Sequence, residues 1–462
     1  MKKLLFFFAL CPLLSIAQNI HGTIVSQNTN LPLENTNVSA LSSKVGTITD
    51  ENGQFSLKLL SKFKGDEILE FSQVGYITTQ FSLSYLAKNN YKVFLEEEVQ
   101  NLSNVIIAAT HKLKLKLPYN KLTPIKHGVF SFGSFLKDGK IYVIGGDTSV
   151  EADLLQLIRS KRADFNLNNY MEASKQISLF SYYRRDFSIY DIKTDTWEYP
   201  KLELKINKRA YHNIHYYDNS IYILGGKKLF VNNRNIWEYL QDQIEVLDLE
   251  KQTIKIDNTN PHQAADFASF TYKDNIVVLG GSISSTESGE KKFTNKVHLY
   301  NIPSGYWYEL TNMPTPKETT GILVDDKIYL IGGNDGKPLS QIETFDLNTQ
   351  VWQTEGELFS ALDKPAIAYH ENMIYAYEDQ LIYTYDVMTR QLKEYEMDLA
   401  LKYSAMYYDD NKLYLLGGRN ENRHTKSPSS NVFSIDVEDF KNTKPTRTKI
   451  LSQKPNIVKA HG

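Results

Sequence analysis

The chain has 462 residues, more than one ordinary hydrophobic core supports, so at least two folding units are expected. A formal net charge of −2 gives no electrostatic basis for binding nucleic acid. The 30 tyrosines and 22 phenylalanines suit a protein built mainly of β-strands.

The first 17 residues have the pattern of a secretory signal peptide. Two lysines at 2–3 precede an apolar run at 4–16, and small residues lead to a cleavage site after Ala17. This run is too short to anchor the chain across a bilayer, and no later stretch is long and apolar enough to do so. We therefore expect an exported protein without a transmembrane segment after signal removal, in the periplasm, at the outer membrane or outside the cell. The only cysteine, Cys11, leaves with the signal.

Residues 18–97 alternate between apolar and polar side chains in short runs, which is typical of the strands of a β-sandwich. The acidic run at 50–53 lies between two such strands. It predicts a hairpin turn, with a calcium loop as the less favoured alternative.

The same segment resembles the carboxypeptidase regulatory-like domain. The matching positions are Gly22, Pro32-Leu33, Gly46-Thr47, Thr49-Asp50, Gly53, Phe55, Phe71 and Gly75-Tyr76. The resemblance implies a transthyretin-like β-sandwich without a catalytic role, of the type found at the N-terminus of outer-membrane receptors in the Bacteroidetes lineage. Residues 98–116 are then expected to be a linker that includes a ring-closing strand.

A short apolar strand ending in Gly-Gly recurs through the rest of the chain. The five intact copies end at Gly146, Gly226, Gly281, Gly333 and Gly418, and a sixth, MIYAYE at Met373 to Glu378, lacks the glycines. Each copy follows a turn rich in Asp and Asn. Each is followed by a loop of variable length and by a strand ending in Asp or Asn, and five of the six then carry a large apolar residue six positions later. These landmarks indicate four antiparallel strands repeated six times.

This pattern resembles the kelch repeat, which implies a β-propeller with one blade per copy. The predicted fold is all-β, an N-terminal β-sandwich followed by a six-bladed kelch β-propeller at residues 117–452 and a tail at 453–462. A propeller has to pair its last edge strand. We expect His111 to Pro118 to close the ring, with Arg447 to Leu451 as the alternative.

The loops after each Gly-Gly open on the same face as the residues leading into each innermost strand. Those residues are mostly cationic, so we expect a mildly positive funnel that receives a carboxylate or an acidic sugar. Solvated charges at the strand ends are the alternative interpretation. The candidate ligand-binding residues are Lys126, His127, Arg209, Tyr211, His212, Lys317, Lys364, Lys402 and Tyr403.

No cysteine or histidine pattern suggests a metal site, and no motif implies a cofactor. The sequence therefore favours a non-catalytic binding protein that recognises a glycan or a protein partner in the cell envelope. The alternative is a periplasmic enzyme acting on an acidic sugar, by resemblance to kelch-type epimerases of sialic acid. Arg209 and His212 would then supply the acid–base groups.

Overall fold

A computed structural model describes residues 18–59, 66–97, 113–152, 171, 182–202, 205–231, 236–285, 290–423 and 425–452. The chain divides into two compact units, Met1–Thr110 and His111–Gly462, and each is considered by itself. None of the helices in the described ranges has the length and apolar character needed to cross a bilayer.

The first unit is a sandwich of two sheets with strand orders β3-β2-β5-β6 and β4-β1-β7. Its elements are β1 (Gln18–Ser26), β2 (Asn37–Ala40), β3 (Val45–Ile48), β4 (Gln54–Leu59), β5 (Ile68–Ser72), β6 (Thr79–Ser82), α1 (Leu83–Lys88) and β7 (Lys92–Leu95). Inward-facing side chains such as Ile24, Val38 and Leu69 are completely buried between the sheets.

The predicted hairpin at residues 50–53 is wrong in one respect. The amide of Gly53 donates to the Asp50 carbonyl (2.9 Å), so the tight turn exists. The Asp50 carboxylate accepts the amides of Asn52 and Gln54 at 2.9 and 2.8 Å. The flanking strands β3 and β4 belong to different sheets, however, so the turn carries the chain across the sandwich.

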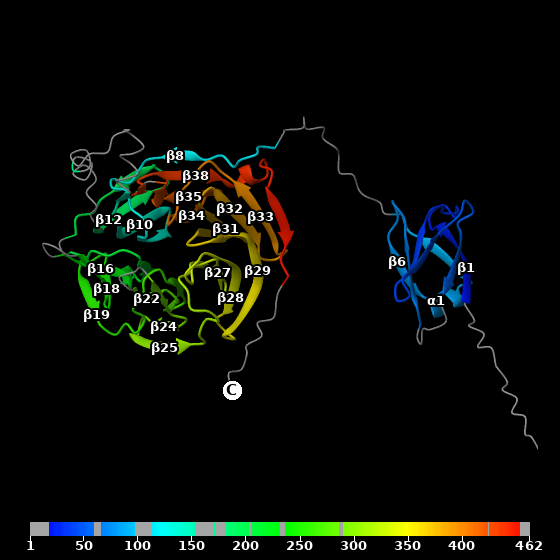
Figure 1. Ribbon diagram of the computed structural model, residues 1–462, viewed down its shortest axis with the longest axis horizontal. Helices are drawn as coiled ribbons and strands as arrows, with labels where there is room; N and C mark the ends of the chain where they lie inside the picture. The colour runs from blue at the N-terminus through cyan, green and yellow to red at the C-terminus, as the bar shows by residue number, and fades with distance from the viewer. Residues whose placement is uncertain are drawn as a thin grey trace, which may run out of the picture. The chain divides into compact units, whose positions relative to one another are not determined.

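The second unit is a ring of six antiparallel sheets, the blades, in chain order around one axis (Figure 1). The first three blades are β9 (Gly133–Lys137), β10 (Lys140–Asp147), β12 (Tyr183–Asp191) and β13 (Thr196–Glu198); β14 (Asn213–Tyr217), β15 (Ser220–Leu224), β18 (Ile244–Asp248) and β19 (Ile254–Asp257); β20 (Ala268–Tyr272), β21 (Asn275–Leu279), β24 (Val297–Asn301) and β25 (Tyr306–Leu310).

The last three blades follow the same order from the inner to the outer strand. They are β26 (Gly321–Val324), β27 (Lys327–Ile331), β28 (Leu339–Asp346) and β29 (Val351–Leu362); β30 (Ala366–His370), β31 (Met373–Glu378), β32 (Leu381–Asp386), β33 (Gln391–Glu396) and β39 (Arg447–Ile450); β34 (Ala405–Asp409), β35 (Lys412–Leu416), β38 (Val432–Asp436) and β8 (Asn120–Leu122). A short 3-10 helix, η1 (Val437–Phe440), follows β38.

The ring is closed from the N-terminal side, but not by the residues expected. Strand β8 pairs antiparallel with β38 as the outer strand of the sixth blade, with Leu122 opposite Val432. The predicted segment lies just before β8. Its residue Leu117 is 1% exposed, and its amide donates to the Glu396 carbonyl (2.8 Å), so this segment packs against the ring instead of pairing with β38. The alternative, β39, adds a fifth strand to the fifth blade.

The Gly-Gly pairs join each blade to the next. The second glycine donates its amide to a carbonyl that precedes the next inner strand, as Gly226 does to Ala264 at 2.8 Å. Gly226 has φ of 81°, and a methyl group there would lie 2.4 Å from the Ala210 carbonyl oxygen. Glycine is therefore required where neighbouring backbones approach most closely.

In the fifth blade, Glu378 and Asp379 occupy the glycine positions, one residue later than MIYAYE suggests. The register shows this, because Met373 pairs with Asp386 as Lys327 pairs with Asp346. Asp379 and Gln380 both have positive φ and form a two-residue hairpin turn. No long loop leaves this blade, and the Asp379 amide still donates to Leu401 in the next blade (3.0 Å).

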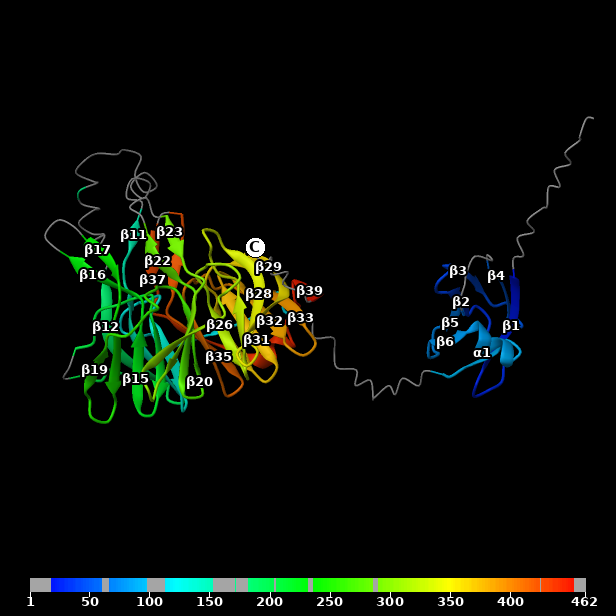
Figure 2. The ribbon, with the colours of Figure 1, turned by 90° about the horizontal axis from the view of Figure 1, so that it is seen from below.

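Extra strands rise from one end of the ring (Figure 2). They form the hairpin β16 (Lys227–Val231) with β17 (Ile236–Leu240), the hairpin β22 (Ser282–Ser285) with β23 (Lys291–Phe293), and a small sheet of β11 (Glu151–Ala152), β36 (Arg419–Glu421) and β37 (Thr425–Pro428). Isolated bridges such as Ala210 to Lys227 join the start of these loops to the residues before an inner strand. The expected shared face is therefore present.

Candidate functional site

Six equivalent residues, one from each blade, surround the axis at the loop-bearing end. We call them the axial ring, and they are Ser131, Tyr211, Asp266, Thr319, Lys364 and Tyr403. Four backbone hydrogen bonds connect five of them. The amide of Ser131 donates to the Tyr403 carbonyl (3.4 Å) and that of Tyr211 to Ser131 (2.7 Å). The amide of Asp266 donates to Tyr211 and that of Thr319 to Asp266, both at 3.2 Å. The bonded backbone thus surrounds the axis at the loop-bearing end, which we call the mouth of the channel. The side chains around this mouth determine its chemistry.

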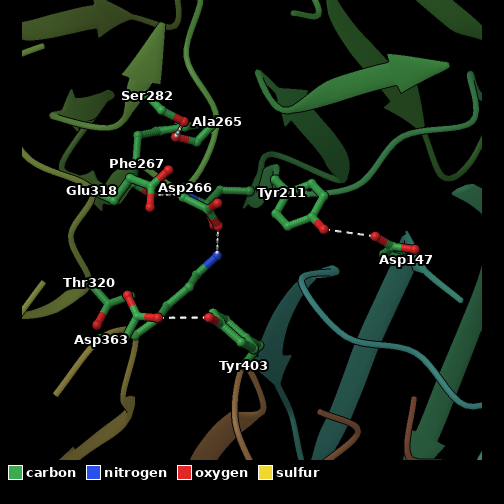
Figure 3. Close-up of polar contacts among 12 residues, drawn as sticks. Asp147, Tyr211, Ala265, Asp266, Phe267, Ser282, Glu318, Thr320, Asp363 and Tyr403 are labelled. Carbon is green, nitrogen blue, oxygen red and sulfur yellow. Dashed lines mark hydrogen bonds and ion pairs between the residues drawn. The ribbon is translucent and has the colours of Figure 1, made fainter. Parts of the chain in front are cut away.

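Those side chains form a network of carboxylates, tyrosines and lysines (Figure 3). The hydroxyl of Tyr211 donates to Asp147 and that of Tyr403 donates to Asp363, both at 2.7 Å. Lys364 reaches across the mouth to form an ion pair with Asp266. The two tyrosine hydroxyls and the Lys364 ammonium are therefore each already bound to a carboxylate.

Three carboxylates of this network are buried. Asp147, Asp266 and Glu318 are 4%, 7% and 6% exposed. Burial raises the pKa of Asp147. Burial, together with the nearby Asp266 carboxylate, raises the pKa of Glu318 even though Lys291 binds it at 2.7 Å. The cations Lys364 and Lys291 are thus paired with carboxylates at the mouth, so they do not form the free positive funnel that was expected.

Two of the predicted ligand-binding cations lie inside the blades. The Arg209 side chain is completely buried and forms an ion pair with Glu245. Lys317, with a 2% exposed side chain, forms the same pair with Glu343 at the equivalent position of the fourth blade. Their guanidinium and ammonium groups also donate to carbonyls beside the Gly-Gly pairs. These side chains link the backbone beside each glycine pair to a carboxylate on the third strand, and each buried charge depends on its partner for compensation.

The remaining predicted cations at the mouth have acidic partners as well. Lys364 is bound to Asp266, and Lys402 lies 3.5 Å from Glu421 and 3.9 Å from Asp379. The sequence prediction considered only the residues leading into the inner strands. Asp266 is one of those residues, in the third blade, whereas Glu421 lies after the glycines of the sixth blade and Asp379 in the turn of the fifth.

His212 is a packing residue. It is 2% exposed, and a methyl group at Gly226 would lie 2.7 Å from its Cβ. Phe132 and Phe267 are at the equivalent positions of the neighbouring blades, and each packs against a Gly-Gly pair in the same way. Burial, with Arg209 and Lys364 nearby, holds the pKa of His212 well below its usual value, so the ring is neutral. Neither it nor Arg209 is placed to act as an acid or base on a substrate.

Lys126 and His127 lie away from the axis. They line a cavity beside the first blade, together with Arg184, Arg185 and Tyr199. The structure thus divides the candidate residues among the buried ion pairs, the channel mouth, the packed position of His212 and this lateral cavity.

The hairpin of β16 and β17 presents exposed aromatic side chains at the loop-bearing end. Phe230 and Trp237 are directly opposite each other, with ring centroids 5.7 Å apart. Tyr239 lies on the same face, and the three side chains are 57%, 39% and 51% exposed. We call them the aromatic strip. A groove of about 350 Å³ separates this hairpin from β22 and β23 and is lined by Tyr239, Ser284 and Lys291, among others.

Both units match known families. The family described as the KLHDC2/KLHL20/DRC7 Kelch-repeats domain matches residues 181–384, and the CarboxypepD_reg-like domain matches residues 20–107. The chain carries a kelch-repeat domain and a carboxypeptidase regulatory-like domain.

Curated relatives are similar to the kelch domain. Kelch-like protein 40 of Xenopus tropicalis is 26% identical over 250 residues, which is 50% of this chain and 39% of that protein. Tip elongation aberrant protein 3 of Schizosaccharomyces pombe is 36% identical over 90 residues, 18% of this chain and 8% of that protein. This chain thus covers well under two thirds of these relatives. The solved structure of YjhT aligns with a TM-score of 0.49 and 10% identity over 72% of this chain and 99% of that one.

Sequence reasoning did not identify Asp147, Glu318 and Asp363 as parts of the channel mouth of the kelch domain. Asp147 directly follows the first Gly-Gly pair, and Glu318 and Asp363 each precede an axial-ring residue. Aligning the positions on both sides of each glycine pair would have placed all three at the mouth.

Glu378 gives the kelch domain a pH-dependent stability. Its carboxylate accepts the amides of Asp363 (2.7 Å) and Lys364 (3.1 Å), and burial raises its pKa from 4.5 to about 7. Between these values the folded protein holds a proton that the unfolded chain has released. The unfolding free energy should therefore fall by about 3 kcal/mol from this group as pH rises from 4.5 to above 7.

The measurement is denaturant unfolding followed by the fluorescence of the four tryptophans, all of which lie in the propeller. Glu378→Gln should flatten the pH profile, because the amide does not titrate. Glu371→Gln is the control, since that side chain is 81% exposed in the same blade. Identical profiles for Glu378→Gln and the wild type would show that the pKa of Glu378 is the same in the folded and the unfolded chain.

Proposed function

We propose that this chain is an exported, non-catalytic binding protein whose kelch domain recognises a protein partner in the cell envelope. The binding surface is the loop-bearing end of the propeller. Export rests on the signal-peptide pattern of residues 1–17, which lie outside the described residues. The periplasm, the outer membrane and the extracellular side are the compartments this signal allows.

The aromatic strip is the observation that carries this proposal. Phe230, Trp237 and Tyr239 lie side by side on a two-stranded hairpin that projects from the ring, and all three are exposed. Large aromatic side chains dominate the centres of protein interfaces, because they bury much area at little cost in conformational entropy. The kelch relatives support a protein-interaction propeller in general.

Site-specific cross-linking in the producing cells tests the proposal. A photoreactive phenylalanine analogue at Trp237 should yield one defined protein adduct. The same analogue at Tyr306 should not, because Tyr306 is 66% exposed but begins β25 after the β24–β25 turn, at the other end of the ring. The purified partner should then bind Trp237→Ala about 30-fold more weakly, as expected for a residue worth about 2 kcal/mol.

Two outcomes would overturn the proposed protein partner. One is the absence of any adduct specific to position 237. The other is binding to an envelope glycan that Trp237→Ala abolishes, which would assign the surface to sugars.

A further inference from the structure

A cavity of about 280 Å³ lies beside the first blade, and its lining residues include none of the axial ring or the aromatic strip. Its floor is apolar and includes Val129, Val143, Phe187 and Ile206. The floor belongs to β10, β12 and the two segments that lead into the first and second blades. This volume is close to the lower limit for small-molecule sites, which are typically concave and mostly apolar.

Cationic side chains surround this floor. Lys126, Arg184, Arg185 and Lys205 all line the cavity, and the one carboxylate among its lining residues is Asp186. Asp186 is bound to Arg184. Within the described part of the chain, Lys126, Arg185 and Lys205 have no carboxylate partner, unlike the cations at the channel mouth. Among the described lining residues, positive charge therefore exceeds negative charge.

Two further groups face the same space. The hydroxyl of Tyr199 accepts the amide of Lys126 at 2.9 Å, so its own hydrogen is available to a ligand. His127 also lines the cavity, and burial, with Arg184 and Lys126 nearby, lowers its pKa. A negative charge bound here would oppose that effect and raise the His127 pKa.

We propose that this lateral cavity binds a small organic carboxylate with an apolar body. The carboxylate would contact Arg185 and Lys205 at the rim, and the body would cover Phe187 and Val143 on the floor. Arginine suits such a group because its fork of N–H donors matches the two carboxylate oxygens. The site is separate from the aromatic strip and does not depend on a protein partner.

The test uses 4-fluorobenzoate as the probe and the full-length protein, with ¹⁹F NMR and calorimetric titration. Saturable binding is expected for 4-fluorobenzoate and at least tenfold weaker binding for 4-fluorobenzamide, which has the same shape without the charge. Arg185→Gln and Lys205→Gln should each weaken the benzoate about tenfold. Lys255→Gln, an exposed position on β19 outside the cavity, should bind as the wild type does.

The His127 imidazole provides a second readout. Its pKa, followed by NMR, should rise when 4-fluorobenzoate is bound and should not change with the benzamide. Equal binding of the two probes, or an unchanged affinity in Arg185→Gln, would overturn the carboxylate site. Equal binding of inorganic phosphate would overturn the apolar half of the proposal. Absence of saturable binding to 4-fluorobenzoate would overturn it entirely.

Discussion

Replacing Arg209 by methionine is expected to lower the free energy of unfolding by about 3–5 kcal/mol. The guanidinium is completely buried and is the ion-pair partner of Glu245, whose side chain is 2% exposed. Methionine fills similar space but leaves the carboxylate buried without a cation, with only the Asn207 amide (3.0 Å) still donating to it. Tryptophan fluorescence in a urea titration measures the loss.

A matched double variant separates the ion pair from simple packing. Arg209→Met combined with Glu245→Leu removes both charges, so it should recover most of the lost stability. Lys317→Met should act in the same direction as Arg209→Met, because Lys317 and Glu343 form a nearly as buried pair in the fourth blade, with side chains 2% and 10% exposed. If the single and double variants are equally unstable, the buried charge is not the cause.

Cross-linking β8 to β38 should stabilise the protein by about 5 kcal/mol. Only three residues of β8 pair with the sixth blade, so the non-covalent closure is short. Cysteines at Asn120 and Ser434, which are opposite each other, would enclose a loop of about 315 residues. A loop of that length restricts the unfolded chain strongly, which is the main source of the stabilisation.

The comparison is between the oxidised and reduced forms of one Asn120→Cys/Ser434→Cys variant. It is made in a Cys11→Ser background, so that no other thiol is present. Asn120→Cys alone is the control and should not respond to oxidant. Failure of the pair to cross-link would show that another segment closes the ring in solution.

Much of the propeller could be predicted from sequence, because its landmarks repeat at fixed positions. The acid-ended strands finish where expected, at residues such as Asp248 and Asp346. Trp307 and Trp352 lie on the fourth strands of their blades, as the six-residue spacing indicates. Each landmark depends on local backbone geometry, which a short stretch of sequence specifies.

The chemistry of the channel mouth could not be predicted in the same way. Lys364 is neutralised by Asp266, which is 98 positions away and two blades distant. Both residues belong to the axial ring, so the sequence places them at equivalent positions but does not say which of the six side chains contact one another. The sequence analysis also misplaced the strand that closes the ring. That strand, β8, is only three residues long and polar in part, so it carries little sequence signal.

The two-residue turn of the fifth blade has a consequence for how anything docks on this propeller. Six similar blades alone would offer a partner six nearly equivalent rotational positions about the axis. Raised hairpins on the second, third and sixth blades, and the low turn at Asp379 and Gln380 on the fifth, remove that equivalence. The loop-bearing end therefore has no six-fold repeat, and a rigid partner that docked on it would be restricted to one rotational orientation.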